Sequence, residues 1–242
     1  MPRDGRPLGL DSWDAVVFDL GGVLLNLDYS ATTEAFQRLA RRQLPGFYSK
    51  ARQADLFDRF ERGEIDVVRF RAALRAALEA ECLDAELDAA WNALLGEVPR
   101  RNIELVLRLR ETHGVYLLSN TNELHLADFI ARFEREHGGA HGPWSELFHK
   151  DYYSHLIGLR KPERAVFEHV VRAEGLEPQR TLFIDDNWHN VLGARDAGLH
   201  GAWLDVPARG ARQPGGPPAS ELHPQLDGAP DIHELFRRFN GS

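Results

Sequence analysis

The chain of 242 residues has a single cysteine, Cys82, and no long apolar segment. One cysteine excludes an intrachain disulfide and a cysteine-based metal site. Cys82 falls in a helical pattern, which favours a structural thiol over a nucleophile. No segment approaches the roughly 20 apolar residues of a membrane-spanning helix, and the polar residues 1–13 lack the apolar run of a signal peptide. We therefore expect a cytoplasmic protein without a membrane partner.

Positive charge is also in short supply. There are 29 Lys and Arg against 37 Asp and Glu, a formal net charge of −8. Nucleic-acid binding needs a basic face, so no nucleic-acid partner is expected. A small phosphorylated substrate is not excluded, because a few cations or a metal can meet its charge locally. With 43% hydrophobic residues, the chain can bury a sizeable core. Its length fits one large domain, or a core domain with a smaller insertion.

A short apolar run, residues 15–18, ends at Asp19, and Gly21 and Gly22 follow it. A strand that is apolar at nearly every position is typical of a parallel sheet covered on both faces by helices. Asp19 would then lie at the carboxyl edge, where open α/β sheets bind ligands. A plain Asp-Gly turn after a buried strand is the alternative for this stretch alone.

Strands and helices alternate along the rest of the chain, which predicts an α/β fold with a doubly wound, Rossmann-like parallel sheet. Residues 30–96 are the exception, because their apolar residues repeat with helical spacing, with Asp66 and Asp84 at helix starts. We therefore predict an α/β core of residues 1–28 and 97–242 and an inserted helical domain of residues 29–96. Further strands are predicted at 115–119, 148–154, 181–184 and 200–204, and helices at 101–113, 123–136, 191–197 and 231–239.

Several single residues mark the expected boundaries. Gly114 is expected to end the helix before it, and Pro162 to be the first residue of a helix. Gly198 is expected to close the helix over 191–197. The glycine- and proline-rich residues 208–218 are expected to form a flexible loop.

Polar side chains cluster after the predicted strands. Because parallel strands end at the same edge of a sheet, these groups can converge. Three carboxylates would repel one another without a cation, and oxygen ligands of this kind suit Mg²⁺. A lysine and a hydroxyl would hold phosphoryl oxygens, and a carboxylate beside them can attack phosphorus to form an aspartyl-phosphate. The groups are Asp19, Ser119 with the residues to Asn122, Arg160 with Lys161, and Asp185 with Asp186.

Taken together, these motifs resemble the haloacid dehalogenase superfamily across nearly the whole chain. The position of the helical insertion resembles that of the family's helical cap. The resemblance is greatest to the sugar-phosphatase branch, which includes α-D-glucose-1-phosphate phosphatases. The matching segments are Phe18 to Val23, Leu117 to Asn120, Lys161-Pro162, Phe183 to Asn187 with Gly193-Ala194, and the loop Glu61 to Ile65.

The resemblance implies a role for each matching residue. Asp19 would be the nucleophile and a Mg²⁺ ligand, with the carbonyl of Gly21 and the carboxylate of Asp186 as further ligands. Asp185 would be a ligand or a partner just behind the metal, or would cap the next helix. Ser119 and Asn120 would hold the phosphoryl group, and Lys161 would neutralise it. Arg62 would touch substrate from the cap, or form a surface ion pair.

One position departs from the family. Its phosphatases usually carry a second Asp two residues after the nucleophile, as general acid and base, and here that residue is Gly21. Losing a positioned acid typically costs roughly 10²–10⁴-fold in rate. A good leaving group, such as an anomeric phosphate, needs protonation less, and some relatives share the Asp-x-Gly form. Asp28 is a candidate substitute acid, with a surface or capping role as the alternative.

Other polar and aromatic residues near the motifs each have two possible roles. His125 and His189 follow motifs two and four, so each would line the pocket or face solvent. Asn190 stands where the family often has an Asp that orients the lysine, and an amide oxygen would accept the same bond. Trp91 and Trp188 are expected to pack rather than to stack on sugar.

The expected function is a Mg²⁺-dependent phosphatase that acts on a small phosphorylated metabolite, with a sugar phosphate favoured. One alternative is a haloacid dehalogenase, which also uses an Asp nucleophile but needs no metal. The other is a phosphate-binding or regulatory protein with little turnover, because Gly21 removes the acid. Both a monomer and a homodimer are compatible with the sequence.

Overall fold

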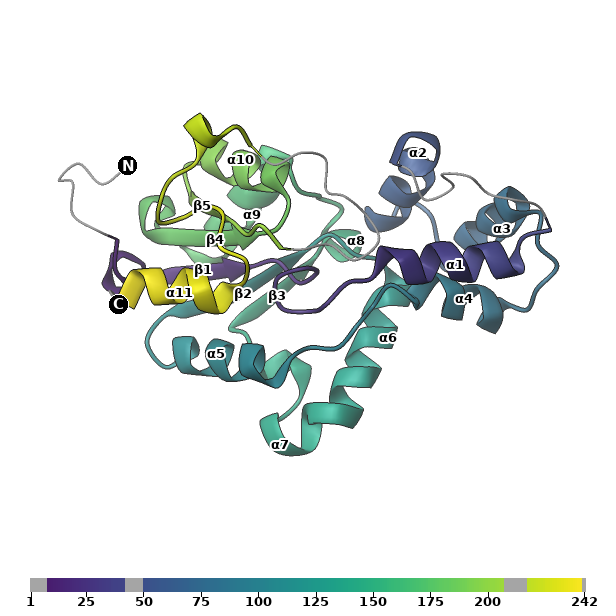
Figure 1. Cartoon of the computed structure of the whole chain (residues 1–242), viewed down its shortest axis with the longest axis horizontal. Helices are drawn as coiled ribbons and strands as arrows, with labels where there is room; N and C mark the ends of the chain where they lie inside the picture. Colours follow the sequence, from purple (N-terminus) through teal and green to yellow (C-terminus); the bar gives the residue numbers. More distant parts are fainter. Residues whose placement is uncertain (1–7, 42–49, 207–216, 241–242) are drawn as a thin grey trace.

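Five parallel strands form a single sheet in the computed structural model (Figure 1), which describes residues 8–41, 50–206 and 217–240, with only the backbone given for 50–54. The order β3-β2-β1-β4-β5 places the first strand in the middle, and the chain winds outward from it in both directions. This confirms the predicted doubly wound α/β fold. The strands are β1 (Ala15–Phe18), β2 (Gly114–Ser119), β3 (Lys150–Tyr153), β4 (Thr181–Asp185) and β5 (His200–Trp203).

Helices cover both faces of the sheet, as the continuous apolar strands predict. Val17 of β1 packs in one apolar cluster with helices α9 (Arg164–Glu174) and α10 (Trp188–Asp196). Its neighbour Phe18 packs on the opposite face in a second cluster. That face is covered by α5 (Arg100–Arg110), α6 (Glu123–Phe133) and α11 (Ile232–Asn240).

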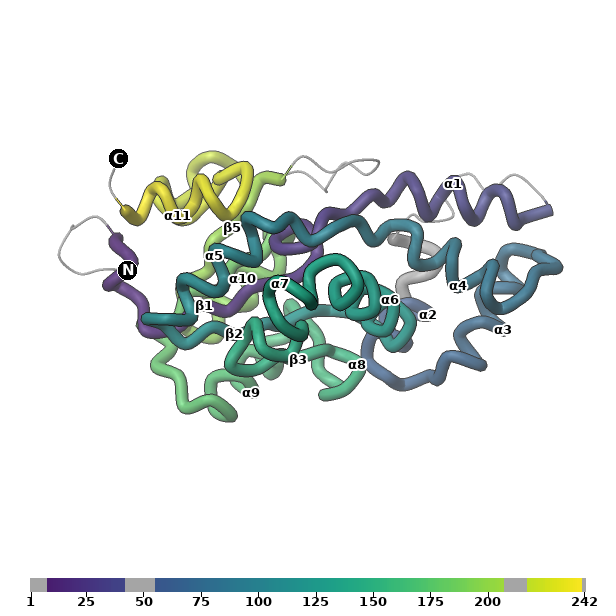
Figure 2. Tube along the Cα trace, turned by 90° about the horizontal axis from the view of Figure 1, so that it is seen from below, coloured from purple at the N-terminus to yellow at the C-terminus, as the bar shows by residue number. Residues whose placement is uncertain are grey.

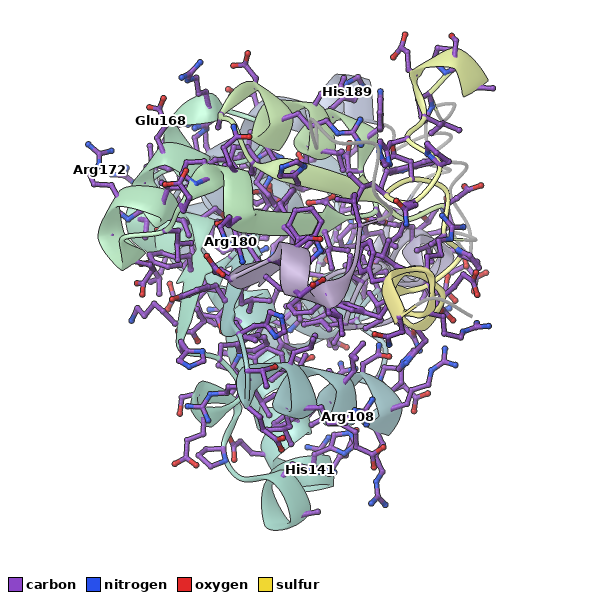
Figure 3. The ribbon with its side chains drawn as sticks, turned by 90° about the vertical axis from the view of Figure 1, so that its left-hand side faces the viewer. Arg108, His141, Glu168, Arg172, Arg180 and His189 are labelled. Carbon is purple, nitrogen blue, oxygen red and sulfur yellow. The ribbon has the colours of Figure 1, made fainter. Side chains whose placement is uncertain are left out.

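Figure 3 looks at the end of the sheet away from the four-helix region, with Arg180, just before β4, near the middle. Glu168 and Arg172 of α9 lie on one side of the sheet, and Arg108 of α5 and His141 lie on the other. The two helical layers are therefore visible in one view.

Four helices, hereafter the helical module, lie together to one side of the sheet (Figures 1 and 2). They share an apolar cluster centred on Phe36, Phe70 and Trp91, separate from the two clusters of the sheet. The domain boundaries at 28/29 and 96/97 stay a prediction. The helices are α1 (Tyr29–Leu39), α2 (Lys50–Glu61), α3 (Val67–Leu78) and α4 (Asp84–Asn92).

The two chain segments that join the module to the sheet run side by side. Leu27 and Leu95 form an antiparallel bridge. The Asn26 N–H donates to the Glu97 carbonyl (3.0 Å), and the Asp28 N–H donates to the Leu94 carbonyl (2.9 Å). Entry to and exit from the module are thus held together by backbone hydrogen bonds.

Local signals placed several helix starts correctly. Asp66 caps α3 by accepting from the Arg69 N–H (2.8 Å), and α4 begins at Asp84. The expected helix over 231–239 is α11, and Gly198 follows α10 with a positive φ of +91°. Short helical turns complete the list: η1 (Leu10–Ser12), η2 (Glu134–Gly138), α7 (Gly139–His141), η3 (Trp144–Glu146), α8 (Ser154–Ile157), η4 (Pro178–Arg180) and η5 (Ala219–Glu221).

Two boundary predictions were wrong. Gly114 does not end a helix, because α5 ends at Arg110 and the Gly114 N–H donates to the Asp14 carbonyl as β2 begins. Pro162 does not begin a helix, because it lies in a turn closed by the Glu163 N–H on the Arg160 carbonyl. Helix α9 therefore starts two residues later, at Arg164.

Two other expectations concern the loop over 208–218 and membrane-spanning helices. Most of the expected loop over 208–218 lies outside the described residues. Among the residues described, no helix combines the length and apolarity that crossing a membrane requires.

Candidate active site

The polar cluster lies where the winding of the sheet reverses, between β1 and β4. Phe18 is in register with Ile184, and the Asp19 N–H donates to the Ile184 carbonyl (2.9 Å). Asp19 and Asp185 therefore leave adjacent strands at the same height. This crevice at the switch point is where open α/β sheets bind ligands.

Lys161 joins the two carboxylates. Its Nζ lies 2.7 Å from Asp19 Oδ1 and 2.8 Å from Asp185 Oδ2. The lysine is buried, 1% exposed. Its segment is far from both acids in sequence, so the fold brings the three side chains together. Burial lowers the pKa of Lys161, but the two carboxylates outweigh this and hold that pKa above its usual value, so the side chain stays charged. The predicted convergence of Asp19, Lys161 and Asp185 is present in the structure.

Asp185 is fixed by donors on both carboxylate oxygens. Besides Lys161, it accepts from the Asn187 N–H (2.7 Å) and from the Asn190 side-chain amide (3.0 and 3.2 Å). Asn190 thus donates to Asp185 rather than accepting from Lys161, which corrects the expected contact. The ammonium of Lys161 is bound instead by two carboxylates, which are stronger acceptors for it than an amide oxygen.

Asp186 lies against the glycine turn that follows β1. A Cβ built on Gly22 would come within 2.4 Å of Asp186 Oδ2. The backbone of Gly22 also has a positive φ of +78°. Both facts require glycine there, since any side chain would be strained and would displace the carboxylate.

Asn120 binds the backbone of Lys161 with both ends of its side chain. Its Nδ2 donates to the Lys161 carbonyl (2.9 Å), and its Oδ1 accepts from the Lys161 N–H (3.0 Å). Ser119 is buried at the end of β2, 3% exposed. Sequence reasoning placed Asn120 in the site but missed this contact, which no local spacing signals. The phosphoryl-binding roles of Ser119 and Asn120 stay predictions.

The acids form a donor set that fits a divalent cation. Asp19, Asp185 and Asp186 each offer an oxygen within 4.8 Å of the others, the one such group of three in the described residues. Burial and the neighbouring Asp185 raise the pKa of Asp19 to about 7. Burial and the other two acids likewise raise the pKa of Asp186. Lys161 alone does not offset three carboxylates, so a hard cation would relieve their repulsion.

Gly21 is covered by an apolar side chain. A Cβ built at Gly21 would come within 2.7 Å of Leu27 Cδ1. Asp28, the candidate substitute acid, caps α1 and accepts from the N–H groups of Ser30 and Ala31 (3.0 and 3.3 Å). The capping alternative therefore accounts for Asp28. Metal binding by the Gly21 carbonyl stays a prediction.

The helical module touches the sheet domain beside Lys161. Arg160 binds Glu61 at the end of α2 (2.8 and 2.9 Å) and also Asp58 (3.1 Å). Arg62 forms an ion pair with Glu163, as the ion-pair alternative expects. Substrate binding by Arg62 stays a prediction. Burial raises the pKa of Glu61, with Arg160 opposing it.

The two histidines have different surroundings. His125 is buried, stacks on Trp91 with ring centroids 4.6 Å apart, and lies 3.3 Å from the Trp91 carbonyl. It is therefore a packing residue between α4 and α6. His189 is exposed at the outer surface of α10 (Figure 3), which fits the solvent-facing alternative.

Trp203 is a contact that sequence reasoning missed. Its indole Nε1–H donates to the carbonyl of Asp186 (3.0 Å) from the end of β5. The contact follows from the register of the sheet, which sets Asp185 beside Trp203. Strand pairing is not visible in the sequence pattern.

Known proteins of similar sequence include phosphatases. A D-ribitol-5-phosphate phosphatase of Bacteroides thetaiotaomicron is 29% identical over 184 residues, 76% of this chain and 88% of the relative. A sesquiterpene phosphatase of Aspergillus oryzae is 26% identical over 197 residues, 80% and 90% of the two chains.

Solved structures agree in fold. A HAD family enzyme from B. thetaiotaomicron in complex with magnesium and inorganic phosphate is 31% identical, with a TM-score of 0.70 over 84% of this chain and 98% of that one. An L-2-haloacid dehalogenase is 20% identical with a TM-score of 0.59 over 95% and 99%, a likeness of fold alone. The model of the haloacid dehalogenase-like hydrolases matches residues 13–198. The chain belongs to that family of hydrolases.

Proposed function

We propose that the protein is a Mg²⁺-dependent phosphatase that hydrolyses a small phosphorylated metabolite, a sugar or polyol phosphate, through an aspartyl-phosphate on Asp19. The observation that carries the proposal is the buried group of Asp19, Lys161, Asp185 and Asp186 at the switch point. Membership of a hydrolase family, with phosphatases among the relatives, supports a phosphoric monoester hydrolase.

Each residue has a chemical task in this proposal. An Asp19 carboxylate oxygen attacks phosphorus, the bond from phosphorus to the substrate oxygen breaks, and the alcohol leaves. Water then attacks the phosphorus of the aspartyl-phosphate, which releases inorganic phosphate and restores Asp19. Lys161 places a fixed positive charge 2.7 Å from Asp19 and meets the phosphoryl oxygens.

Asp19 and Asp186 would hold Mg²⁺, together with the Gly21 carbonyl. Asp185 would stand just behind them, because both of its oxygens already accept hydrogen bonds. The bound ion would supply charge neutralisation of the phosphoryl group. Ser119 would donate its hydroxyl to the same group, and the helical module would act as the family's cap over the site.

A phosphatase screen with and without Mg²⁺ tests the proposal. Anomeric sugar phosphates and primary polyol phosphates are the two arms, since the first needs less protonation of its leaving group. We expect Mg²⁺-dependent release of phosphate, and a loss of roughly 10⁴-fold or more in Asp19→Asn. Asp14→Asn is the matched control, the same change at the other end of β1, and is expected to keep its activity.

Four results would contradict the proposal. Metal-independent turnover, or activity that survives Asp19→Asn, would exclude the mechanism. Halide release from a 2-haloacid would favour a dehalogenase. Saturable binding of a phosphate analogue without turnover of any ester would favour a phosphate-binding protein that lacks its acid at Gly21.

A further inference from the structure

Trp203, at the end of β5, contacts the loop that directly follows the neighbouring strand β4 and carries Asp186. Asp185 and Trp203 are in register, and the Leu204 N–H donates to the Asp185 carbonyl (3.1 Å). One residue on, the ladder is replaced by a side-chain bond, the indole N–H of Trp203 on the carbonyl of Asp186 (3.0 Å). The Asp186 peptide is thus held by a ring rather than by a strand.

That ring is itself fixed by the C-terminal part of the chain. Asp227, whose side chain is fully buried, accepts from the Trp203 backbone N–H (3.0 Å) and from Arg195 (2.7 Å to each oxygen). Arg195 lies over the ring of Trp188 (4.9 Å), and the rings of Trp188 and Trp203 meet edge to face at 6.1 Å. Trp203 consequently has little freedom to turn away from Asp186.

The orientation of the Asp186 peptide decides where its carboxylate points. On its other side this carboxylate lies against Gly22. One of its oxygens lies within 4.8 Å of an oxygen of each of the other two acids. Mutual repulsion would turn the carboxylates apart, and a free peptide would let them separate. A hydrogen bond to the Asp186 carbonyl resists that rotation.

We propose that Trp203, supported by Asp227, is a positioning residue that keeps Asp186 directed into the cation site. The inference rests on the proposed function, because it takes Asp19 and Asp186 as residues that hold Mg²⁺, with Asp185 behind them. Trp203 and Asp227 both lie beyond residues 13–198, which the family model matches. The metal affinity of this chain therefore depends on a segment outside that match.

The test is direct Mg²⁺ binding measured by isothermal titration calorimetry on the full chain, without substrate. Trp203→Phe removes the indole donor and keeps an aromatic ring. Trp188→Phe is the matched control, the same change in the other ring of the pair, which makes no hydrogen bond to the loop. We expect about a 10-fold weaker Mg²⁺ affinity for Trp203→Phe, as for other partners of metal ligands, and less than a twofold change for Trp188→Phe.

The kinetic counterpart separates positioning from support of the fold. Trp203→Phe should raise the Mg²⁺ concentration at half-maximal phosphatase rate by the same factor and keep kcat within about twofold at saturating Mg²⁺. If Trp203→Phe is recovered unfolded, Asp227→Asn takes its place, with a smaller loss of Mg²⁺ affinity of about threefold.

Each outcome decides one question. A wild-type protein that binds no Mg²⁺ overturns the proposed function and the inference together. If the wild-type protein binds Mg²⁺ and folded Trp203→Phe binds it equally tightly, the inference alone is overturned. The same holds for folded Asp227→Asn where that variant is used. Equal losses in Trp203→Phe and Trp188→Phe would also overturn it, since they would reflect ring packing and not the hydrogen bond.

Discussion

At Gly21 the chain has no side chain where phosphatases of the family usually carry an acid. Leu27 fills the adjacent space, with its Cδ1 2.7 Å from the place of a Cβ. The position is therefore closed by an apolar group as well as lacking a carboxylate. In the proposed reaction the leaving oxygen would receive its proton from solvent, which favours substrates whose alcohol is a good leaving group.

Restoring the acid should change the substrate preference. We expect Gly21→Asp combined with Leu27→Ala to raise kcat/KM for a primary alkyl phosphate by about 10²-fold, with a far smaller gain for an anomeric phosphate. The second substitution makes room for the new carboxylate. The measurement is kcat/KM on both esters for the double variant and for Leu27→Ala alone. An equal gain on both esters would contradict a role in leaving-group protonation.

Helices α4 and α6 meet through a buried histidine. His125 stacks on Trp91 and lies 3.3 Å from its carbonyl, and the Trp91 indole donates to Asn122 (3.3 Å) at the start of α6. Burial lowers the pKa of His125 to about 3. The side chain is therefore neutral in the folded protein at pH values where an unfolded histidine is charged.

This contact predicts an acid sensitivity of known sign. Below pH 6.5 the unfolded chain binds a proton that folded His125 does not, so the free energy of unfolding falls as the pH drops from 6.5 toward 3. The loss is about 1.4 kcal/mol per pH unit, and it is absent above pH 6.5. Urea unfolding at several pH values measures it. His125→Phe, which keeps the stacking, should flatten the slope by one proton; an unchanged slope would place the sensitivity elsewhere.

Local patterns predicted most elements, because caps and apolar periodicity act over a few residues. Asp66 at the start of α3 and the apolar strands that end at Asp19 and Asp185 are examples. The same patterns misplaced Pro162, whose position depends on a turn bond between Glu163 and Arg160. Helix propensity alone does not report that bond.

The candidate site was predictable in composition but not in detail. Asp19 and Asp185, at the ends of adjacent strands, meet Lys161 as expected, although Lys161 lies in the turn before α9. The partners of the site, Asn120 on Lys161 and Trp203 on Asp186, depend on side-chain contacts between segments far apart in sequence. No spacing rule encodes such contacts, since they follow from strand order and register.

At the scale of the whole molecule, charged contacts add to the backbone and apolar contacts between the helical module and the rest of the chain. Arg160 is the centre of one contact, with two bonds to Glu61 and one to Asp58, and its side chain is 22% exposed. Arg62 and Glu163 form a second, more exposed pair. The more buried contact should contribute more to stability, because water screens it less.

Removing the two contacts separately tests that ranking. We expect Arg160→Gln to lower the free energy of unfolding by about 1.5–3 kcal/mol, since it leaves the carboxylate of Glu61 without its partner. Glu163→Gln should cost less than about 1 kcal/mol. Urea unfolding of both variants measures the difference, and equal losses would contradict it.

The paired segments around Leu27 and Leu95 have a consequence for how such a protein can change. Because the insertion leaves and returns through neighbouring backbone segments, it requires only two adjacent attachment points beside the sheet. Lengthening or replacing what lies between them adds little to the entropy of closing the loop. The reacting groups on the sheet and the inserted surface that would select the substrate can therefore evolve at separate rates, with the first kept while the second is exchanged.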